Sequence, residues 1–237
     1  MNPDYTAPAI ATLLRPPALT QSLAEQIAAK LCTDILAGVY APGQRIMEQT
    51  VALTFAVSRG PVREALRLLE KDGLVSILPR RGAQVTNPTI AEVYEIFNIR
   101  AMLNGLRDRM IAESPTRVEL LPQLAQEIEC LRVSATETDN GYIDTVIRLN
   151  QWLTQVAGNA RLQAILSALA IQTVRYTRLG LATPERRAQS VGHWQATLIA
   201  IRNGDGPGAE RIARQRVLDS RDAAATQLGQ APPAHSS

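Results

Sequence analysis

The chain has 237 residues, of which 46% are hydrophobic, and its net charge is +3. This length suits two domains with buried cores better than one small domain. Polar residues interrupt every apolar run well before the ~20 residues of a membrane-spanning helix. The N-terminal residues lack the basic and apolar regions of a signal peptide. We therefore expect a cytoplasmic protein with no membrane partner.

The two cysteines, Cys32 and Cys130, lie far apart in the sequence, and each falls within a helical pattern. Such a pair predicts two buried thiols and not a disulfide framework. Both cysteines are therefore expected to be reduced, as they would be in a reducing compartment.

The first domain is predicted to cover residues 20–87, after a flexible tail of residues 1–19 that is rich in proline and small residues. Its first helix repeats apolar residues at every fourth position, as an amphipathic helix does. A turn containing proline and glycine follows, and then a short helix at 48–55. A third helix begins after Ser58, which is a suitable N-cap, and ends before Gly73.

Two short apolar segments, LVSIL and AQVT, follow the third helix, and the loop PRRG separates them. This pattern predicts a two-stranded β-hairpin. Three helices followed by such a two-stranded wing form a small domain of about 70 residues.

Residues 88–229 are predicted to form an all-α antiparallel helical bundle. Short breaks that contain proline, glycine or asparagine separate six helical segments. The predicted helices are 90–113, 117–134, 141–157, 160–180, 184–203 and 207–228. Residues 230–237 predict a disordered tail. The predicted fold class is therefore mainly α, with a small β-hairpin in the N-terminal domain.

Arginines gather at two places in the first domain. Arg59, Arg63 and Arg67 are spaced four residues apart and share one face of the third helix, while Arg80 and Arg81 lie at the tip of the hairpin. Arginine can pair bidentately with guanine in the major groove, and a helix N-terminus favours phosphate. We expect both groups to face DNA. The alternative is a solvated charged face, because neighbouring acids offer local ion pairs.

The segments ILAGVYAPGQRIMEQ, SRGPVREALRLLEKDGLV and PRRGAQV closely resemble the winged helix-turn-helix domain of the GntR family of bacterial transcription regulators. The resemblance covers about residues 20–86. It implies DNA contacts by residues of the third helix, the preceding helix and the wing tip. The predicted DNA-contacting residues are Gln49, Ser58, Arg59, Gly60, Arg63, Arg80, Arg81 and Gly82. Gly60 departs from the family, in which threonine is common, so we expect an altered sequence preference.

Residues 88–228 resemble the helical effector domain of the FadR branch through EVYEIFNIRAMLNGLRDRM, VAGNARL, SVGHWQATLIAIRNGD and AERIARQRVL. The resemblance implies a homodimer that binds a small metabolite, typically a carboxylate. Many members also hold a divalent metal with an aspartate and three histidines. Those positions fall here on Val146, Asn150, Trp194 and Arg216, none of which is a usual strong ligand. A shift of one residue would substitute His193, but a three-histidine site stays impossible, so we expect no cofactor.

The bundle is instead expected to hold a small anionic or acyl metabolite without a metal, because arginine binds carboxylates and phosphates bidentately. The predicted pocket residues are Arg100, Val146, Asn150, Arg175, Trp194 and Arg216. The alternative is that Val146 and Trp194 pack as core and close the cavity.

The leading functional hypothesis is a sequence-specific dimeric regulator, a repressor controlled by a small carboxylate or other anionic metabolite. Its expected partners are double-stranded operator DNA, the effector and a second copy of the chain, because two half-sites increase affinity and specificity. The alternative is a DNA-binding regulator without small-molecule control, acting architecturally or through a protein partner. The sequence contains no nucleophile elbow, phosphate loop or metal cluster, so we do not expect an enzyme.

Overall fold

The computed structural model describes residues 21–79, 81–136 and 141–229. These residues form two compact units. One consists of the described residues up to Pro88 together with Ala170–Gln172, and the other of Thr89–Leu169 and the described residues from Thr173 onward. The two predicted tails and Arg80 lie outside the described residues.

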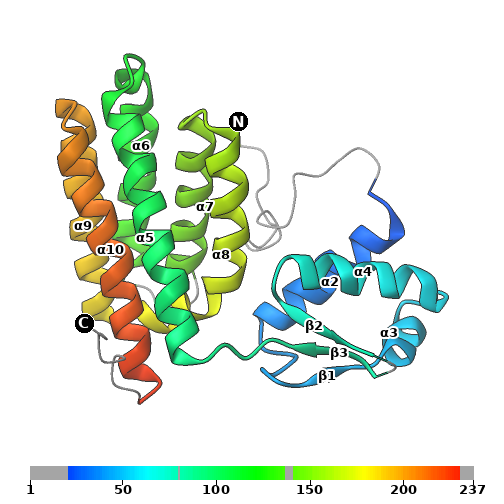
Figure 1. Ribbon diagram of the computed structural model, residues 1–237. Coiled ribbons are helices and arrows are strands. Elements are labelled where there is room, and N and C mark those ends of the chain that lie inside the picture. Colours follow the sequence, from blue (N-terminus) through cyan, green and yellow to red (C-terminus); the bar gives the residue numbers. More distant parts are fainter. Residues whose placement is uncertain (1–20, 80, 137–140, 230–237) are drawn as a thin grey trace. The chain divides into compact units, whose positions relative to one another are not determined.

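The first unit contains three helices and a small antiparallel sheet (Figure 1). Its elements are α2 (Leu23–Leu36), β1 (Arg45–Ile46), α3 (Glu48–Thr54), α4 (Arg59–Lys71), β2 (Val75–Leu78) and β3 (Gly82–Val85). Helices α2 and α4 pack together through apolar side chains that include Ile27, Leu31, Val62 and Leu66, all of them buried. The prediction of three helices followed by a hairpin is confirmed.

The sheet has one strand more than the sequence predicted. Arg45 and Ile46 were expected in a turn, but they form β1, which pairs antiparallel with β3 opposite Gln84 and Ala83. The strand order is therefore β1-β3-β2. A strand of two residues is too short to show an alternating pattern, so only its pairing with β3 reveals it. The buried side chain of Ile46 anchors this strand in the core.

Gly82 is expected to be required for the closure of this sheet. Its φ is +79°, and a Cβ at this position would lie 2.5 Å from the carbonyl oxygen of Ile46. We expect Gly82→Ala to lower the free energy of unfolding by about 1–2 kcal/mol for the left-handed backbone alone, and further for the clash with β1. Urea unfolding measures this loss.

Gly38→Ala is the matched control, because Gly38 has a φ of +82° and an added Cβ would meet no atom within 4 Å. This variant should show only the loss of unfolding free energy that comes from the left-handed backbone, because the added Cβ meets no clash. Equal losses in the two variants would show that the oxygen of Ile46 does not crowd position 82.

The second unit is entirely helical within the described residues. Its helices are α5 (Ile90–Glu113), α6 (Arg117–Ser134), α7 (Gly141–Val156), α8 (Ala160–Gly180), α9 (Pro184–Asn203) and α10 (Gly206–Gln227). All six predicted helices are confirmed, with ends that differ by at most one residue. Their starts follow local signals: Thr89 and Glu92 form a capping box at α5, and Asn159 caps α8.

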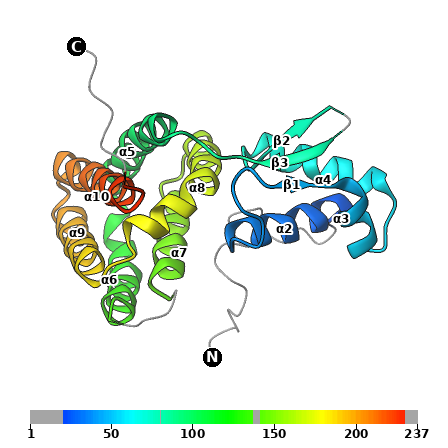
Figure 2. The same ribbon diagram turned by 90° about the horizontal axis from the view of Figure 1, so that it is seen from below.

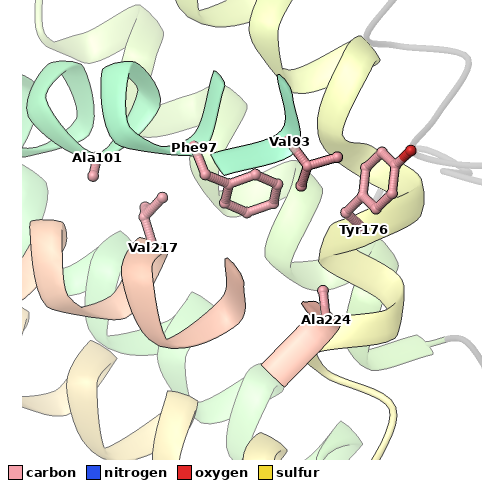
Figure 3. Close-up of a cluster of buried hydrophobic side chains, with 6 residues drawn as sticks. All are labelled: Val93, Phe97, Ala101, Tyr176, Val217 and Ala224. Carbon is pink, nitrogen blue, oxygen red and sulfur yellow. The ribbon is translucent and has the colours of Figure 1, made fainter. Parts of the chain in front are cut away.

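Helices α5 and α10 lie side by side along much of their length (Figures 1 and 2). An apolar cluster joins one end of this pair to α8 (Figure 3). Its members are Val93, Phe97, Ala101, Tyr176, Val217 and Ala224. These contacts fix the register of α5 against α10, and therefore also set the position of the residues further along both helices.

The cysteines differ from each other in environment. Cys32 is fully buried, and burial, reinforced by the negative charge of Asp72, raises the pKa of its thiol to about 12. Cys130 is exposed on α6. The expectation of two buried thiols is therefore wrong for Cys130, because an apolar sequence neighbourhood does not determine which face of a helix meets the core. Both cysteines are free, as expected.

Candidate nucleic-acid interface and buried arginine cluster

A groove of about 440 Å³ lies in the first unit, between α4, the start of α3 and the β2–β3 hairpin. We call it the recognition groove. Its charged lining consists of four arginines and one glutamate, a net charge of +3: Arg59, Arg63, Arg67, Arg81 and Glu48. The other lining residues are Met47, Gln49, Leu66, Ile77, Leu78, Pro79 and Gly82. A concave surface of this sign is suited to a phosphate backbone.

The recognition groove brings together five of the eight predicted DNA-contacting residues, which are Gln49, Arg59, Arg63, Arg81 and Gly82. Ser58 and Gly60 flank Arg59 in the chain and are exposed. The remaining one, Arg80, lies outside the described residues. Tertiary structure therefore places the two predicted arginine groups, as far as they are described, on one face of this unit.

Two side chains at the start of α3 contact two arginines of α4. Nε of Arg63 donates a hydrogen bond to Oε2 of Glu48 at 2.8 Å, and Nη2 of Arg59 donates to Oε1 of Gln49 at 3.4 Å. The side chain of Arg63 keeps 62% of its surface exposed in this pair. The first turn of α3 thus orients both guanidinium groups without burying them.

Sequence reasoning missed Glu48, which is fifteen residues from Arg63. The sequence offered one signal for Glu48, which is its position beside the predicted contact residue Gln49 at the start of the short helix.

The N-terminus of α4 remains accessible. Ser58 occupies the N-cap position with extended backbone angles, but its side chain makes no capping hydrogen bond. The first N–H groups of the helix can therefore bind an anion. A Cβ at position 60 would meet only Oγ of Ser58, at 3.9 Å. The open space at Gly60 allows close approach of another molecule to this turn.

Placing threonine at position 60 is expected to change DNA preference without changing stability. Because the site is open and exposed, Gly60→Thr should alter the free energy of unfolding by no more than ~0.5 kcal/mol. The added hydroxyl supplies a hydrogen-bonding group beside Arg59 and Arg63. Selection from a randomised DNA pool should return a different consensus for this variant. Gly60→Ala is the control, because it adds the Cβ without the hydroxyl and should keep the wild-type consensus.

A second group of charged side chains lies in the helical unit. It consists of Arg100, Arg107 and Asp108 from α5 and Arg216 from α10, and we call it the arginine cluster. Arg107, Asp108 and Arg216 are buried, and Arg100 is partly buried. Asp108 bridges two arginines: Oδ1 accepts from Nε of Arg107 at 2.7 Å, and Oδ2 accepts from Nη2 of Arg216 at 3.1 Å.

The arginine cluster is bonded to three further helices. Nη1 of Arg107 donates to Oδ1 of Asn150 on α7 at 3.0 Å. Nη1 of Arg100 donates to two threonine hydroxyls of α8, Thr173 and Thr177, each at 2.9 Å. On α9, Thr197 accepts from Nη1 of Arg216 at 2.9 Å. Five helices therefore turn polar side chains towards the interior.

Arg216 also stacks on an aromatic ring. Its guanidinium carbon lies 3.4 Å from the centroid of the Trp194 ring, a cation–π contact between α10 and α9. Trp194 is fully buried. The planar guanidinium group is therefore held on one face by the indole and at its edges by Thr197 and Asp108.

The arginines of the cluster affect one another electrostatically. Burial lowers the pKa of Arg100 to about 10, and repulsion by Arg107 and Arg216 contributes to this shift. Burial also lowers the pKa of Arg216 to about 10, although the nearby carboxylate of Asp108 opposes the shift. Both groups remain cationic at neutral pH. Three guanidinium groups and one carboxylate give the cluster a net charge of +2.

The structure brings four of the predicted pocket residues together: Arg100, Asn150, Trp194 and Arg216 all belong to the arginine cluster or contact it directly. Val146 is buried one turn before Asn150.

The structure does not bring Arg175 to this group. Its side chain is exposed, and its guanidinium carbon lies 5.8 Å from the centroid of the Tyr176 ring. The reason is helical geometry, since Thr173 and Thr177 share the inward face of α8 and position 175 points away from it.

Sequence reasoning missed Arg107 and Asp108, the central pair of the cluster. Arg107 follows Arg100 by seven residues, which places both on one face of α5. That spacing was the signal available in the sequence. It was hidden because charged neighbours on a long helix usually mark a solvated face.

The positions that hold a metal in similar effector domains do not fit a metal here. Arg216 stacks on Trp194 and contacts Asp108, so a divalent cation would lie against guanidinium groups. Within the described ranges, no three His, Cys, Asp or Glu side chains gather so that they could hold a metal ion. Nε2 of His193 faces Oδ2 of Asp219 at 3.7 Å, and burial lowers the pKa of this histidine.

A winged helix-turn-helix unit with a basic groove on its recognition helix defines a class of DNA-binding transcription regulators. Comparison with known families agrees with this class. Residues 23–85 match "Bacterial regulatory proteins, gntR family", and residues 95–219 match the FCD domain. The chain belongs to the GntR family of DNA-binding transcriptional regulators and carries an FCD domain, which commonly binds small-molecule effectors.

Individual proteins are similar over most of the chain. The uncharacterized HTH-type transcriptional regulator YdhC of Bacillus subtilis (strain 168) is 34% identical over 166 residues, which are 66% of this chain and 70% of that protein. The HTH-type transcriptional repressor RspR of Escherichia coli (strain K12) is 28% identical over 84% of this chain and 88% of its own.

The structure of E. coli McbR/YncC shares the fold, with a TM-score of 0.71 at 20% identity over 88% of this chain and all of that one. These matches are to transcription regulators and not to enzymes. Across the described residues, every helix is too short or too polar to cross a membrane.

Proposed function

We propose that the chain is a dimeric repressor that reads operator DNA with its recognition groove and responds to a small anionic metabolite. The observation that carries the DNA-reading part is the gathering of Arg59, Arg63 and Arg81 in one groove beside the open turn at Gly60. The similarity to RspR, which is named a repressor, supports repression over activation. A role on DNA in a bacterial regulator family supports a cytoplasmic location.

The first experiment is binding of the purified chain to its own upstream DNA at several salt concentrations. We expect binding at least ~10³-fold tighter than binding to scrambled DNA of the same length. Affinity should fall with salt because the groove displaces counterions from phosphates. Equal affinity for the scrambled sequence would leave only a non-specific charged face and would refute operator recognition.

Dimerisation is supported by an apolar stripe on α5. Ile99, Met102 and Leu106 are spaced as one face of a helix, and they are 54%, 51% and 44% exposed. Contiguous exposed apolar residues mark interaction surfaces. The proposed occupant is a second copy of the chain, because an operator with two half-sites requires two recognition helices.

Met102→Glu is therefore expected to convert the dimer into monomers, because it places a charge in the middle of the stripe. Sedimentation velocity should show half the mass at micromolar concentration, and operator affinity should fall with it. Val133→Glu is the control, since Val133 is 49% exposed on another helix, α6, outside the stripe. A Met102→Glu variant that remains dimeric would exclude this face as the interface.

Control by an anionic metabolite is supported by the arginine cluster. Burying charged groups costs stability unless they are paired, and here five helices use inward positions for polar side chains around a net charge of +2. Such perturbed groups are typical of functional sites. An effector acts if it binds one arrangement of the protein more tightly than another.

The alternative is a regulator without small-molecule control. The burial of Val146 and Trp194, which leaves 6% and 0% of their surfaces exposed, favours a packed bundle interior. One measurement, the melting temperature of the full chain with added metabolites, distinguishes the two hypotheses. A metabolite pool that raises the melting temperature of the full chain supports effector binding, while an unchanged melting temperature across pools supports the alternative.

A further inference from the structure

We propose that Glu48 is a specificity-determining residue of the recognition groove, which holds Arg63 in position to read a base and keeps phosphate away from it. This inference rests on the proposed function, since it concerns how the same groove distinguishes operator DNA from other DNA. Among the described residues that line the groove, Glu48 is the one acid, and the other charged members are four arginines. Glu48 acts through Arg63 and is therefore a positioning residue.

The contact between Glu48 and Arg63 uses only one edge of the guanidinium group. Nε of Arg63 donates to Oε2 of Glu48 at 2.8 Å, which fixes the plane of the group. The other N–H donors are on Nη1 and Nη2, and such a planar fork can pair with O6 and N7 of guanine. Because 62% of the Arg63 side chain is exposed, this fork is accessible to DNA.

The Glu48–Arg63 pair is better suited to fix an orientation than the other acid–arginine pair of α4. Glu64 and Arg67 lie 3.5 Å apart, and the side chain of Glu64 is 57% exposed. The contact of Glu48 is shorter, and its side chain is only 23% exposed. An arginine that is held before DNA arrives loses less rotamer freedom on binding. The structure therefore preorganises Arg63 more than Arg67.

The carboxylate of Glu48 also determines which part of DNA suits Arg63. A phosphate bound to this arginine would bring a full negative charge close to the carboxylate, and like charges repel. The edge of guanine carries only partial charges and is repelled much less. Arg59 differs, because its Nη2 donates at 3.4 Å to the neutral amide of Gln49. The pair with Glu48 thus matches Arg63 to a base, whereas Arg59 can accept either group.

This arrangement increases specificity by weakening the wrong complex. Specificity is a difference between two affinities, so a lower affinity for other sequences counts as much as a higher one for the operator. Arginines that bind phosphate contribute equally on every sequence. Because Glu48 neutralises Arg63 towards phosphate, it lowers the affinity for DNA that offers no suitable base. The oriented fork retains the affinity for the operator.

The test is binding of the full chain and its Glu48→Gln variant to labelled operator and scrambled duplexes over a range of salt concentrations. Glutamine keeps the size of the side chain and removes its charge. Glu64→Gln is the matched control, because it removes the same charge from an exposed position outside the groove lining. Glu48→Asp is a second variant, which keeps the charge on a shorter side chain. Urea unfolding verifies that each variant is folded.

We expect Glu48→Gln to bind scrambled DNA about threefold to tenfold more tightly, because Arg63 becomes free to bind phosphate. The plot of log affinity against log salt should steepen by about 0.9 for each groove that gains a phosphate contact. The ratio of operator affinity to scrambled affinity should fall by about tenfold or more. A variant that had merely lost stability would not bind scrambled DNA more tightly.

The other two variants separate charge from orientation. Glu64→Gln should keep the wild-type salt slope and an affinity ratio within about twofold of the wild type. Glu48→Asp should also keep the salt slope, because the charge remains, while its operator affinity falls because the shorter side chain no longer orients Arg63. Equal changes in Glu64→Gln and Glu48→Gln would assign the effect to net charge and overturn the inference.

A double-mutant cycle tests whether Glu48 acts through Arg63. Glu48→Gln should lower the affinity ratio in the wild-type background and have little effect on it in the Arg63→Ala background. An equal fall in both backgrounds would show that Glu48 contacts a base itself and would overturn the positioning role.

The two proposals can fail separately. A wild-type chain with no preference for the operator would refute operator recognition, and the salt slopes on scrambled DNA would still decide whether Glu48 keeps phosphate from Arg63. A wild-type chain that prefers the operator, with the same preference and slope in Glu48→Gln, would refute the role of Glu48 and keep operator recognition.

Discussion

Arg59→Ala and Arg63→Ala are each expected to abolish sequence-specific operator binding while leaving the fold intact. Both side chains are exposed in the recognition groove, so their loss removes no core packing. A bidentate arginine–guanine pair contributes ~1–3 kcal/mol of discrimination. A dimer loses this pair at both half-sites, so the total loss is ~2–6 kcal/mol, or about 30-fold to 10⁴-fold in affinity. Fluorescence anisotropy with labelled operator measures it.

The control for this prediction is Arg132→Ala, which removes the same charge from the exposed surface of α6 in the other unit. It should retain operator affinity. Arg63→Lys separates the two roles of the guanidinium, because lysine keeps the charge but lacks the planar fork. We expect this variant to keep non-specific binding and lose discrimination. If Arg63→Ala weakened operator and scrambled DNA by the same factor, Arg63 would be a phosphate contact and not a base contact.

Asp108→Asn is expected to cause the largest loss of stability of any single change in the helical unit. The substitution keeps the size of the side chain but removes the carboxylate shared by Arg107 and Arg216. Removing one partner from a buried ion pair costs about 3–5 kcal/mol, because it leaves uncompensated charge in the interior. This is a large part of a typical unfolding free energy of ~5–15 kcal/mol. Urea unfolding followed by circular dichroism measures the loss.

Glu129→Gln is the matched control for Asp108→Asn. It breaks an acid–arginine contact of 2.6 Å with Arg132, but both side chains are more than half exposed. Exposed pairs contribute little, so this variant should unfold at nearly the wild-type urea concentration. The double variant Asp108→Asn with Arg107→Met should recover part of the lost stability, because it removes one of the unpaired charges. An Asp108→Asn variant as stable as the wild type would show that Asp108 does not hold the cluster together.

Most of the fold could be predicted because its signals are local. The helices of both units follow periodic apolar residues, and their ends follow capping residues that act over three or four positions, such as Thr89 with Glu92. The β1 strand could not be predicted in this way. It consists of two residues whose partner, β3, lies almost forty positions away, and its pairing depends on the folded hairpin.

The proposed DNA-binding face could also be predicted from local signals, with the exception of Glu48. The spacing of Arg59 and Arg63 on one helix face is a property of the sequence alone. Their contacts with Gln49 and Glu48 depend on how α3 packs against α4. The sequence therefore indicates which arginines are proposed to read DNA, and the packing determines how their guanidinium groups are oriented.

In the interior of the helical unit, by contrast, the arrangement of the charged side chains could not be predicted from the sequence. The sequence by itself determined that residues 88–229 form a helical bundle. Through the family resemblance it also predicts that Val146, Asn150, Trp194 and Arg216 occupy the positions of a metal site. Only the tertiary structure decided that Arg107 and Asp108 lie at its centre and that Arg175 faces outward. The physical reason is that a charged residue carries the same sequence signal on either face of a helix. Its burial is set by partners on other helices, here Arg216 and Asn150, which neutralise or bond it.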